Sequence, residues 1–129
     1  MPTTATQLVA AAKSRVENLA PDQTAQEAAG DAVLIDLRES AELRNDGMIE
    51  GAVHAPRGML EFWADPDSPY HRPEFDPQQR TVLYCASGGR SALAAQTLAE
   101  LGYTDVAHLD GGIKAWKQAG HPTVAPTAV

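Results

Sequence analysis

Residues 81–101 read TVLYCASGGRSALAAQTLAEL. The first four form a short apolar run of residues that favour β-structure, which predicts a buried strand. The segment from Arg90 to Leu101 is rich in Ala and Leu, and its apolar residues recur at the spacing of one helical face. Gly102 follows at once and predicts the end of that helix. Cys85, the only cysteine of the chain, is therefore expected on a tight turn between a strand end and a helix N-terminus.

The position of Cys85 favours the thiolate, the form in which a cysteine acts as a nucleophile. The first turn of a helix has backbone N–H groups without partners and carries about half a positive charge. Gly88 and Gly89 can let successive N–H groups point at one atom, for which at least one of them is expected to need a positive φ. Arg90 adds a permanent positive charge. A reactive thiol in an anion-binding loop is the predicted arrangement. The alternative is a buried cysteine with only a packing role. The candidate loop consists of Ala86, Ser87, Gly88, Gly89, Arg90 and Ser91.

Strands alternate with helices along the chain, which predicts an α/β domain with a mostly parallel central sheet and helices on both faces. Helices are expected at 6–15, 21–28, 40–45 with Ser40 as the N-cap, 58–64, 90–101 and 112–119. Strands are expected at 16–19, 32–37, 53–55, 81–84 and 105–109, and a proline-containing loop at 65–79. Ligands of such sheets bind at the carboxyl ends of the strands, where Cys85 is expected.

Three segments resemble the rhodanese family of sulfurtransferases, in the order of that family. They are VLIDLRE and GMIEGAVHAP between Val33 and Pro56, the loop from Cys85 to Arg90, and LDGGIKAW from Leu109 to Trp116. Met48 stands where the family usually has a histidine. The resemblance implies a rhodanese-like domain over residues 16–122, a helical N-terminal extension over 1–15 and a loose C-terminal tail over 123–129.

The resemblance also implies a reaction. The Cys85 thiolate would take the outer sulfur of thiosulfate or a similar small anionic donor and carry it as a persulfide. A thiophilic acceptor, such as cyanide, a thiol or a protein cysteine, would then remove that sulfur. The loop N–H groups would stabilise the persulfide anion, and Arg90 would orient the donor. This reaction needs no metal or organic cofactor, so none is expected. The four histidines also show no metal-ligand spacing and are expected to be solvated or internally bonded.

Asp36, Arg38 and Arg57 are candidates for a supporting role. Asp36 and Arg38 end a predicted strand and could line the same sheet edge as Cys85. Asp36 would then order the loop or pair with an arginine, although a turn or an ordinary salt bridge would place it there equally well. Arg57 could add positive charge at the mouth of the site, or form a surface pair with Glu61 one helical turn later.

Two other functions stay open at this point. A cysteine-loop phosphatase or arsenate reductase has a similar layout, with one residue more between the cysteine and the arginine than the four between Cys85 and Arg90. The shorter loop favours a cradle for a single sulfur atom. A non-catalytic rhodanese-like binding module is the second alternative, which the intact Cys85 and Gly-Gly-Arg sequence disfavours.

Composition limits the partners of the protein. A chain of 129 residues fits one domain, and a net charge of −7 with a pI of about 4.9 disfavours binding to nucleic acids or anionic membranes. No apolar run approaches the roughly 18 residues that span a bilayer. The N-terminal apolar stretch has its basic residues behind it, unlike a secretory signal, so a cytoplasmic location is expected.

Overall fold

The computed structural model of the protein describes residues 2–126. The elements in chain order are α1 (Ala5–Lys13), β1 (Glu17–Leu19), α2 (Pro21–Ala29), β2 (Val33–Asp36), α3 (Ser40–Asp46), β3 (Val53–His54), a 3-10 turn (Arg57–Met59), α4 (Leu60–Ala64), β4 (Thr81–Tyr84), α5 (Gly89–Glu100), β5 (Val106–Leu109) and α6 (Gly112–Gln118). Every expected helix and strand is present, with small shifts at the ends. None of the helices in this part of the chain is long and apolar enough to cross a membrane.

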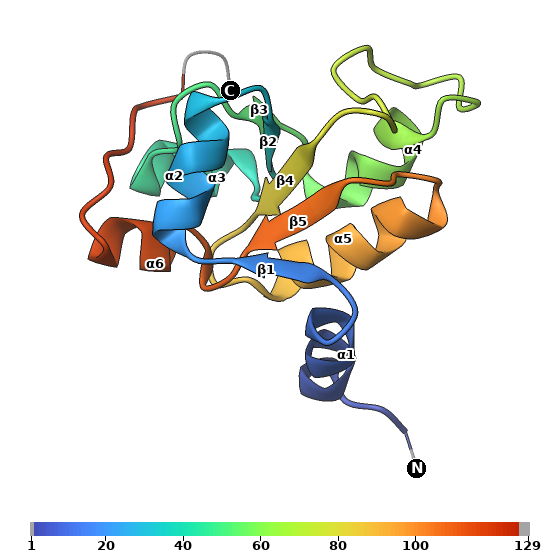
Figure 1. Ribbon diagram of the computed structural model, residues 1–129, viewed down its shortest axis with the longest axis horizontal. Helices are drawn as coiled ribbons and strands as arrows, with labels where there is room; N and C mark the ends of the chain where they lie inside the picture. The colour runs from blue at the N-terminus through green and yellow to red at the C-terminus, as the bar shows by residue number, and fades with distance from the viewer. Residues whose placement is uncertain (1, 127–129) are drawn as a thin grey trace.

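The five strands form one parallel sheet in the order β1-β5-β4-β2-β3, which confirms the expected α/β fold (Figure 1). Figure 1 shows α2 and α6 on one side of the sheet and α4 and α5 on the other. β4 lies in the middle of the sheet, between β5 and β2. Its carboxyl end, and the loop that follows, are therefore enclosed by neighbours on both sides.

The side chains of β4 alternate between the two faces of the sheet, as strand geometry requires. Val82 and Tyr84 belong to the hydrophobic cluster that includes Trp116 of α6. Leu83 and Cys85 belong to the cluster that includes Leu98 of α5. All four strand residues are buried, which explains why this strand is a continuous apolar run.

Parallel pairing of β2 with β4 sets Asp36 beside Tyr84. The residues that follow these two strands, Arg38 and Cys85, therefore lie at the same edge of the sheet. The strand register thus places Asp36 and Arg38 at the sheet edge where the cysteine lies, and their supporting role stays a prediction.

Two details differ from the expected pattern. Ser40 is the first residue of α3, and the N-cap is Glu39, whose backbone N–H donates to the carboxylate of Glu42 at 3.0 Å. The carboxylate of Glu42 thus replaces the serine hydroxyl as the capping group. The tail is not loose at Val124, because its backbone pairs with that of Met48 in an antiparallel bridge. Residues 127–129 of the expected tail lie outside the described part of the chain.

Candidate active site

Cys85 follows β4 directly, and the residue is only 1% exposed. Its Sγ accepts a hydrogen bond from the backbone N–H of Gly88 at 3.2 Å. Gly88 has φ +103°, the left-handed conformation that only glycine adopts cheaply, so the expected positive φ belongs to Gly88 and not to Gly89. Among the described residues, Gly88 supplies the one backbone N–H that donates a hydrogen bond to the sulfur, where several had been expected.

The other loop residues differ in their exposure to solvent. Ser87 is exposed, Ala86, Gly89 and Arg90 are partly exposed, and Ser91 is buried. Gly89 begins α5, so the sulfur lies at the N-terminus of a twelve-residue helix. The partial positive charge of that helix end favours an anion on the sulfur.

The glycine pair before α6 holds the loop from the other side. The N–H groups of Ile113 and Lys114 donate to the carbonyls of Cys85 at 2.9 Å and of Ala86 at 3.2 Å. A Cβ atom on Gly112 would lie 2.5 Å from the carbonyl carbon and oxygen of Ala86, closer than any side chain can approach. The Gly-Gly motif therefore allows two backbone segments to touch. Reasoning from the sequence assigned this motif to the family but not to the loop.

Arg90 points at Glu42 of α3. The guanidinium donates two hydrogen bonds to the carboxylate, Nη1 to Oε1 at 2.8 Å and Nη2 to Oε2 at 2.9 Å. These bonds hold the pKa of Glu42 at about 2, below its ordinary value of 4.5. The side chains are 37% and 32% exposed, so the pair lies within reach of solvent. Glu42 was missed from the sequence, although its spacing from Glu39 is that of a capping box.

A buried polar chain leads away from the thiol on its other side. The hydroxyl of Ser91 lies 3.6 Å from the sulfur of Cys85 and 2.9 Å from Nδ1 of His108. His108 Nε2 lies 2.6 Å from Oδ1 of Asn18, so both ring nitrogens have partners, as expected for an internally bonded histidine. Its connection to the cysteine was not expected, because His108 and Asn18 are distant in sequence from the loop.

Asp36 and Arg38 form a fully buried ion pair. Arg38 Nε donates to Oδ1 at 3.0 Å and Nη2 to Oδ2 at 2.7 Å, and Nη2 also donates to the carbonyl of Gly47. Arg38 Nη1 has no hydrogen-bond partner among the described residues, and the guanidinium lies 5.8 Å from the centre of the Tyr84 ring. The pair therefore holds the end of β2 against the strand that leads to the cysteine.

Arg57 forms the surface pair with Glu61 that was one of its two expected roles, at 2.8 Å. Its other nitrogen reaches Thr97, in the second half of α5 and away from the loop. The structure shows no contact between Arg57 and the described loop residues. A role in charging the mouth of the site stays a prediction.

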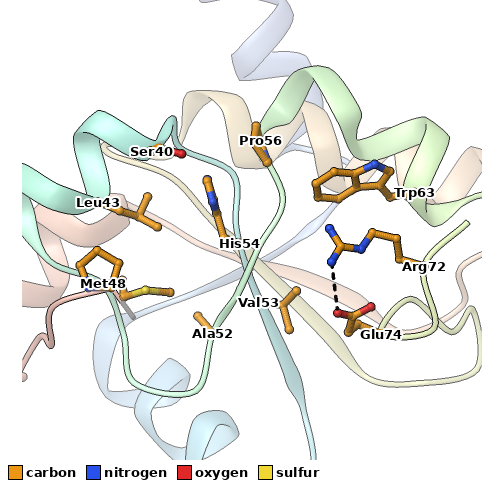
Figure 2. A pocket seen from close by; sticks show the side chains of 11 residues that line it. Ser40, Leu43, Met48, Ala52, Val53, His54, Pro56, Trp63, Arg72 and Glu74 are labelled. Carbon is orange, nitrogen blue, oxygen red and sulfur yellow. Dashed lines mark ion pairs between the residues drawn. The ribbon is translucent and has the colours of Figure 1, made fainter. Parts of the chain in front are cut away.

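A cavity larger than the one at the loop lies away from the cysteine. It has a volume of about 450 Å³ and is lined by His54, Trp63, Arg72 and their neighbours, without a residue of the cysteine loop (Figure 2). Arg72 lies over the ring of Trp63 there, 4.4 Å from its centre. A smaller cavity of about 290 Å³ borders the loop at Ala86 and Ser87. Cavity size alone would therefore point away from the cysteine.

The described part of the chain has no cluster of side chains that could bind a metal ion. Residues 2–126 contain no group of three or more His, Cys, Asp or Glu side chains that could hold a metal ion.

Comparison with known proteins identifies the family. The rhodanese-like domain family matches residues 20–119. A sulfurtransferase from Allochromatium vinosum is 38% identical over 96 residues, which cover 74% of this chain and 81% of the relative. Thiosulfate sulfurtransferase GlpE from Shewanella oneidensis is 35% identical over 67% of this chain and 76% of its own length.

A solved structure from Rhodopseudomonas palustris CGA009 shares the fold over nearly the whole length. It is 42% identical, covers 95% of this chain and 98% of its own, and has a TM-score of 0.87. That protein is described as of unknown function and a possible tyrosine phosphatase. The sulfurtransferases among the relatives support a sulfurtransferase-type role, and the match over most of the sequence, together with the parallel α/β fold, shows that this chain belongs to the rhodanese-like domain family.

Proposed function

We propose that the protein moves a sulfane sulfur from thiosulfate, or a similar small anionic donor, to a thiophilic acceptor through a persulfide on Cys85. The observation that carries the proposal is the hydrogen bond from the Gly88 N–H to the Cys85 sulfur at 3.2 Å, at the N-terminus of α5. An N–H group in this position stabilises an anionic sulfur, whether thiolate or persulfide. The thiosulfate sulfurtransferase among the relatives supports the choice of donor.

The reaction has two halves that share one covalent intermediate. The Cys85 thiolate attacks the outer sulfur of thiosulfate, the S–S bond of the donor breaks, and sulfite leaves with the bonding electron pair. The acceptor then attacks the outer sulfur of the persulfide, and the Cys85 thiolate is restored. Cyanide would serve as the acceptor in an assay, and a small thiol or a protein cysteine would do so in a cell.

Arg90 has the geometry to orient the donor. Its guanidinium already grips two oxygens of the Glu42 carboxylate, at 2.8 and 2.9 Å. A sulfonate-like group presents oxygens at a similar spacing, so thiosulfate can take the place of that carboxylate. The partial exposure of both side chains makes this exchange possible without moving the core.

A phosphatase is the second candidate, because the similar protein from Rhodopseudomonas palustris is described as a possible tyrosine phosphatase. Two features of the loop argue against it. Four residues separate Cys85 from Arg90, one fewer than in the cysteine-loop phosphatases. The cysteine is also 1% exposed, which admits a terminal sulfur atom more easily than a tetrahedral phosphoryl group.

One pair of assays on the same preparation decides between the candidates. We expect sulfur transfer from thiosulfate to cyanide, negligible hydrolysis of aryl phosphates, and loss of the transfer activity in Cys85→Ser. Phosphatase turnover comparable to the transferase turnover, and absent in Cys85→Ser, would reverse the ranking. The absence of both activities would favour a non-catalytic binding module.

A further inference from the structure

The polar chain behind Cys85 is closed to solvent. Ser91 and His108 are fully buried, and Cys85 is 1% exposed. The chain runs from Sγ of Cys85 to Oγ of Ser91 at 3.6 Å, and from there to Nδ1 of His108 at 2.9 Å. A proton that leaves the sulfur has this hydrogen-bonded route available, whereas direct transfer to bulk water is restricted by burial.

Asn18 fixes the tautomer of His108. Its Nδ2 donates to the carbonyls of Lys13 at 2.9 Å and Val16 at 3.0 Å, so its Oδ1 must face the histidine. His108 Nε2 therefore carries a hydrogen, which it donates to Oδ1 at 2.6 Å. In the neutral ring, Nδ1 is then left with a lone pair.

The tautomer of His108 determines the direction in which the Ser91 hydroxyl donates its hydrogen. Its single hydrogen goes to Nδ1 of His108 at 2.9 Å in preference to the carbonyl of Gly88 at 3.3 Å. An oxygen lone pair is thereby free to accept the thiol hydrogen of Cys85. All hydrogen bonds point in one direction, from the sulfur towards the histidine.

We propose that His108 is the base that receives the Cys85 proton, with Ser91 as the relay. The thiol proton moves to Oγ of Ser91 as the Ser91 proton moves to Nδ1 of His108. The products are a thiolate, a neutral serine and an imidazolium, so charge and protons balance. The inference rests on the proposed function only in naming Cys85 as the reacting group.

The surroundings of His108 favour its neutral form, from which the relay starts. Burial lowers the pKa of His108 below its ordinary value of 6.5, so the relay needs the hydrogen bonds of the product state to stabilise the imidazolium. Two further charges act on it: Asp110 after β5 raises this pKa and Lys13 at the end of α1 lowers it, and the two form an ion pair at 3.0 Å. At the other end of the hydrogen-bonded chain, the charged groups are the Cys85 thiolate and the Arg90 guanidinium.

The imidazolium is paired in the product state. With both ring nitrogens protonated, Nδ1 donates to Ser91, and the hydrogen that Ser91 received from the thiol is donated back towards the thiolate. The hydrogen bonds reverse and now stabilise the anion on the sulfur. The relay therefore removes the proton, and the Gly88 N–H and the helix end stabilise the charge that remains.

The rate of alkylation of Cys85 by iodoacetamide tests the relay, because the chain has no other cysteine. The assay needs neither thiosulfate nor sulfur transfer, so its result is independent of the proposed function. Rates would be measured from about pH 6 to about pH 9.5, on either side of the ordinary thiol value of about 8.5. The first variant is His108→Gln, whose amide can still form hydrogen bonds but cannot act as a base. The second is Ser91→Ala, which removes the hydroxyl that links Cys85 to His108.

We expect both variants to react at least about tenfold more slowly than the wild type at about pH 6. At about pH 9.5 solvent base ionises the thiol directly, and the rates should converge to within about threefold. His71→Gln, a change at a histidine bonded to the Phe75 carbonyl, is the matched control and should follow the wild-type profile. Thermal melting would establish that each variant is folded.

The same factor of loss at both pH values would assign His108 a structural role and overturn the proposal. Unchanged rates in Ser91→Ala would overturn it as well, and this variant decides the matter where His108→Gln fails to fold. Nitrogen NMR of the His108 imidazole in the wild type measures its tautomer independently of the alkylation rates. The relay requires the Nε2–H tautomer at pH 7, and the Nδ1–H tautomer would contradict it.

Discussion

Arg38 and Arg90 follow neighbouring parallel strands, and each forms a two-point ion pair with a carboxylate, yet the two pairs differ in exposure. The Asp36–Arg38 pair is 0% exposed on both sides, and Arg38 is also bound by the Gly47 carbonyl. The Arg90–Glu42 pair is 37% and 32% exposed. The same kind of ion pair at the same sheet edge therefore differs in what it can do. The buried arginine fixes the strand, and the exposed one is the arginine for which we propose an exchange of Glu42 for an anionic donor.

Arg38→Ala is expected to have the largest effect on stability. It leaves the Asp36 carboxylate buried without its partner, which costs about 3–5 kcal/mol in the free energy of unfolding. Chemical denaturation of the variant and the wild type measures this loss. Arg90→Ala, the matched change at the exposed pair, should cost less than about 1 kcal/mol. Equal losses in the two variants would remove the distinction between the pairs.

Arg90→Ala should instead lower kcat/KM for thiosulfate by about 10- to 100-fold, the equivalent of one charge-assisted pair of about 1.5–3 kcal/mol. Arg90→Lys should recover only part of the activity, because the planar two-point grip is lost. Steady-state kinetics with varied thiosulfate measure both. Unchanged thiosulfate kinetics in Arg90→Ala would show that the exposed arginine does not bind the donor.

Gly88→Val tests the backbone that links the thiol to Arg90. A valine would carry φ +103° and place its Cβ 3.1 Å from the backbone nitrogen of Gly111. We expect a strain of about 1–3 kcal/mol and a loss of activity much larger than the fall in melting temperature. Gly89→Val is the control, because Gly89 has no positive φ and its Cβ would only meet Val9 at 3.7 Å. Full transferase rate in both variants would show that the Gly88 N–H does not stabilise the sulfur anion.

Glu42→Gln is expected to have the smallest effect. It keeps an oxygen for the Glu39 N–H but weakens the grip on Arg90, so KM for thiosulfate should fall by a few-fold. A raised KM would mean that Glu42 helps to bind the donor rather than competing with it.

The Arg90–Glu42 pair also predicts a dependence of stability on pH. The pKa of Glu42 is lowered to about 2, so its contribution is present above the ordinary value of 4.5 and is lost as pH falls through about 2. Since both side chains are partly exposed, the contribution is below about 1 kcal/mol. Melting temperatures of wild type and Glu42→Gln should therefore converge in acid, and a difference that grows below pH 4.5 would contradict the assignment.

The fold was predictable because its signals are local. The apolar run 81–84, the Ala- and Leu-rich helix after it and the glycine stop each depend on residues close in sequence. The cysteine loop was predictable for the same reason, as was the need for a positive φ at Gly88 or Gly89. The predicted N-cap of α3, Ser40, was wrong, because the helix begins at Ser40 and the Glu42 carboxylate accepts the backbone N–H of the preceding residue, Glu39.

The partners of the loop were not predictable from local patterns. Arg90 is 48 residues from Glu42, and His108 is 90 residues from Asn18. Such pairs form only when the order of strands in the sheet brings distant segments together. Gly112 likewise belongs to a motif that is recognisable in the sequence. Its close approach to the Ala86 backbone could not be predicted, because it depends on where α6 lies in the folded protein.

Intact mass spectrometry after incubation with thiosulfate tests the central claim, a persulfide on Cys85, most directly. The account predicts a gain of one sulfur atom in the wild type, its removal by a reductant or by cyanide, and no gain in Cys85→Ser. The same gain in Cys85→Ser, or no gain in the folded wild-type protein, would contradict it.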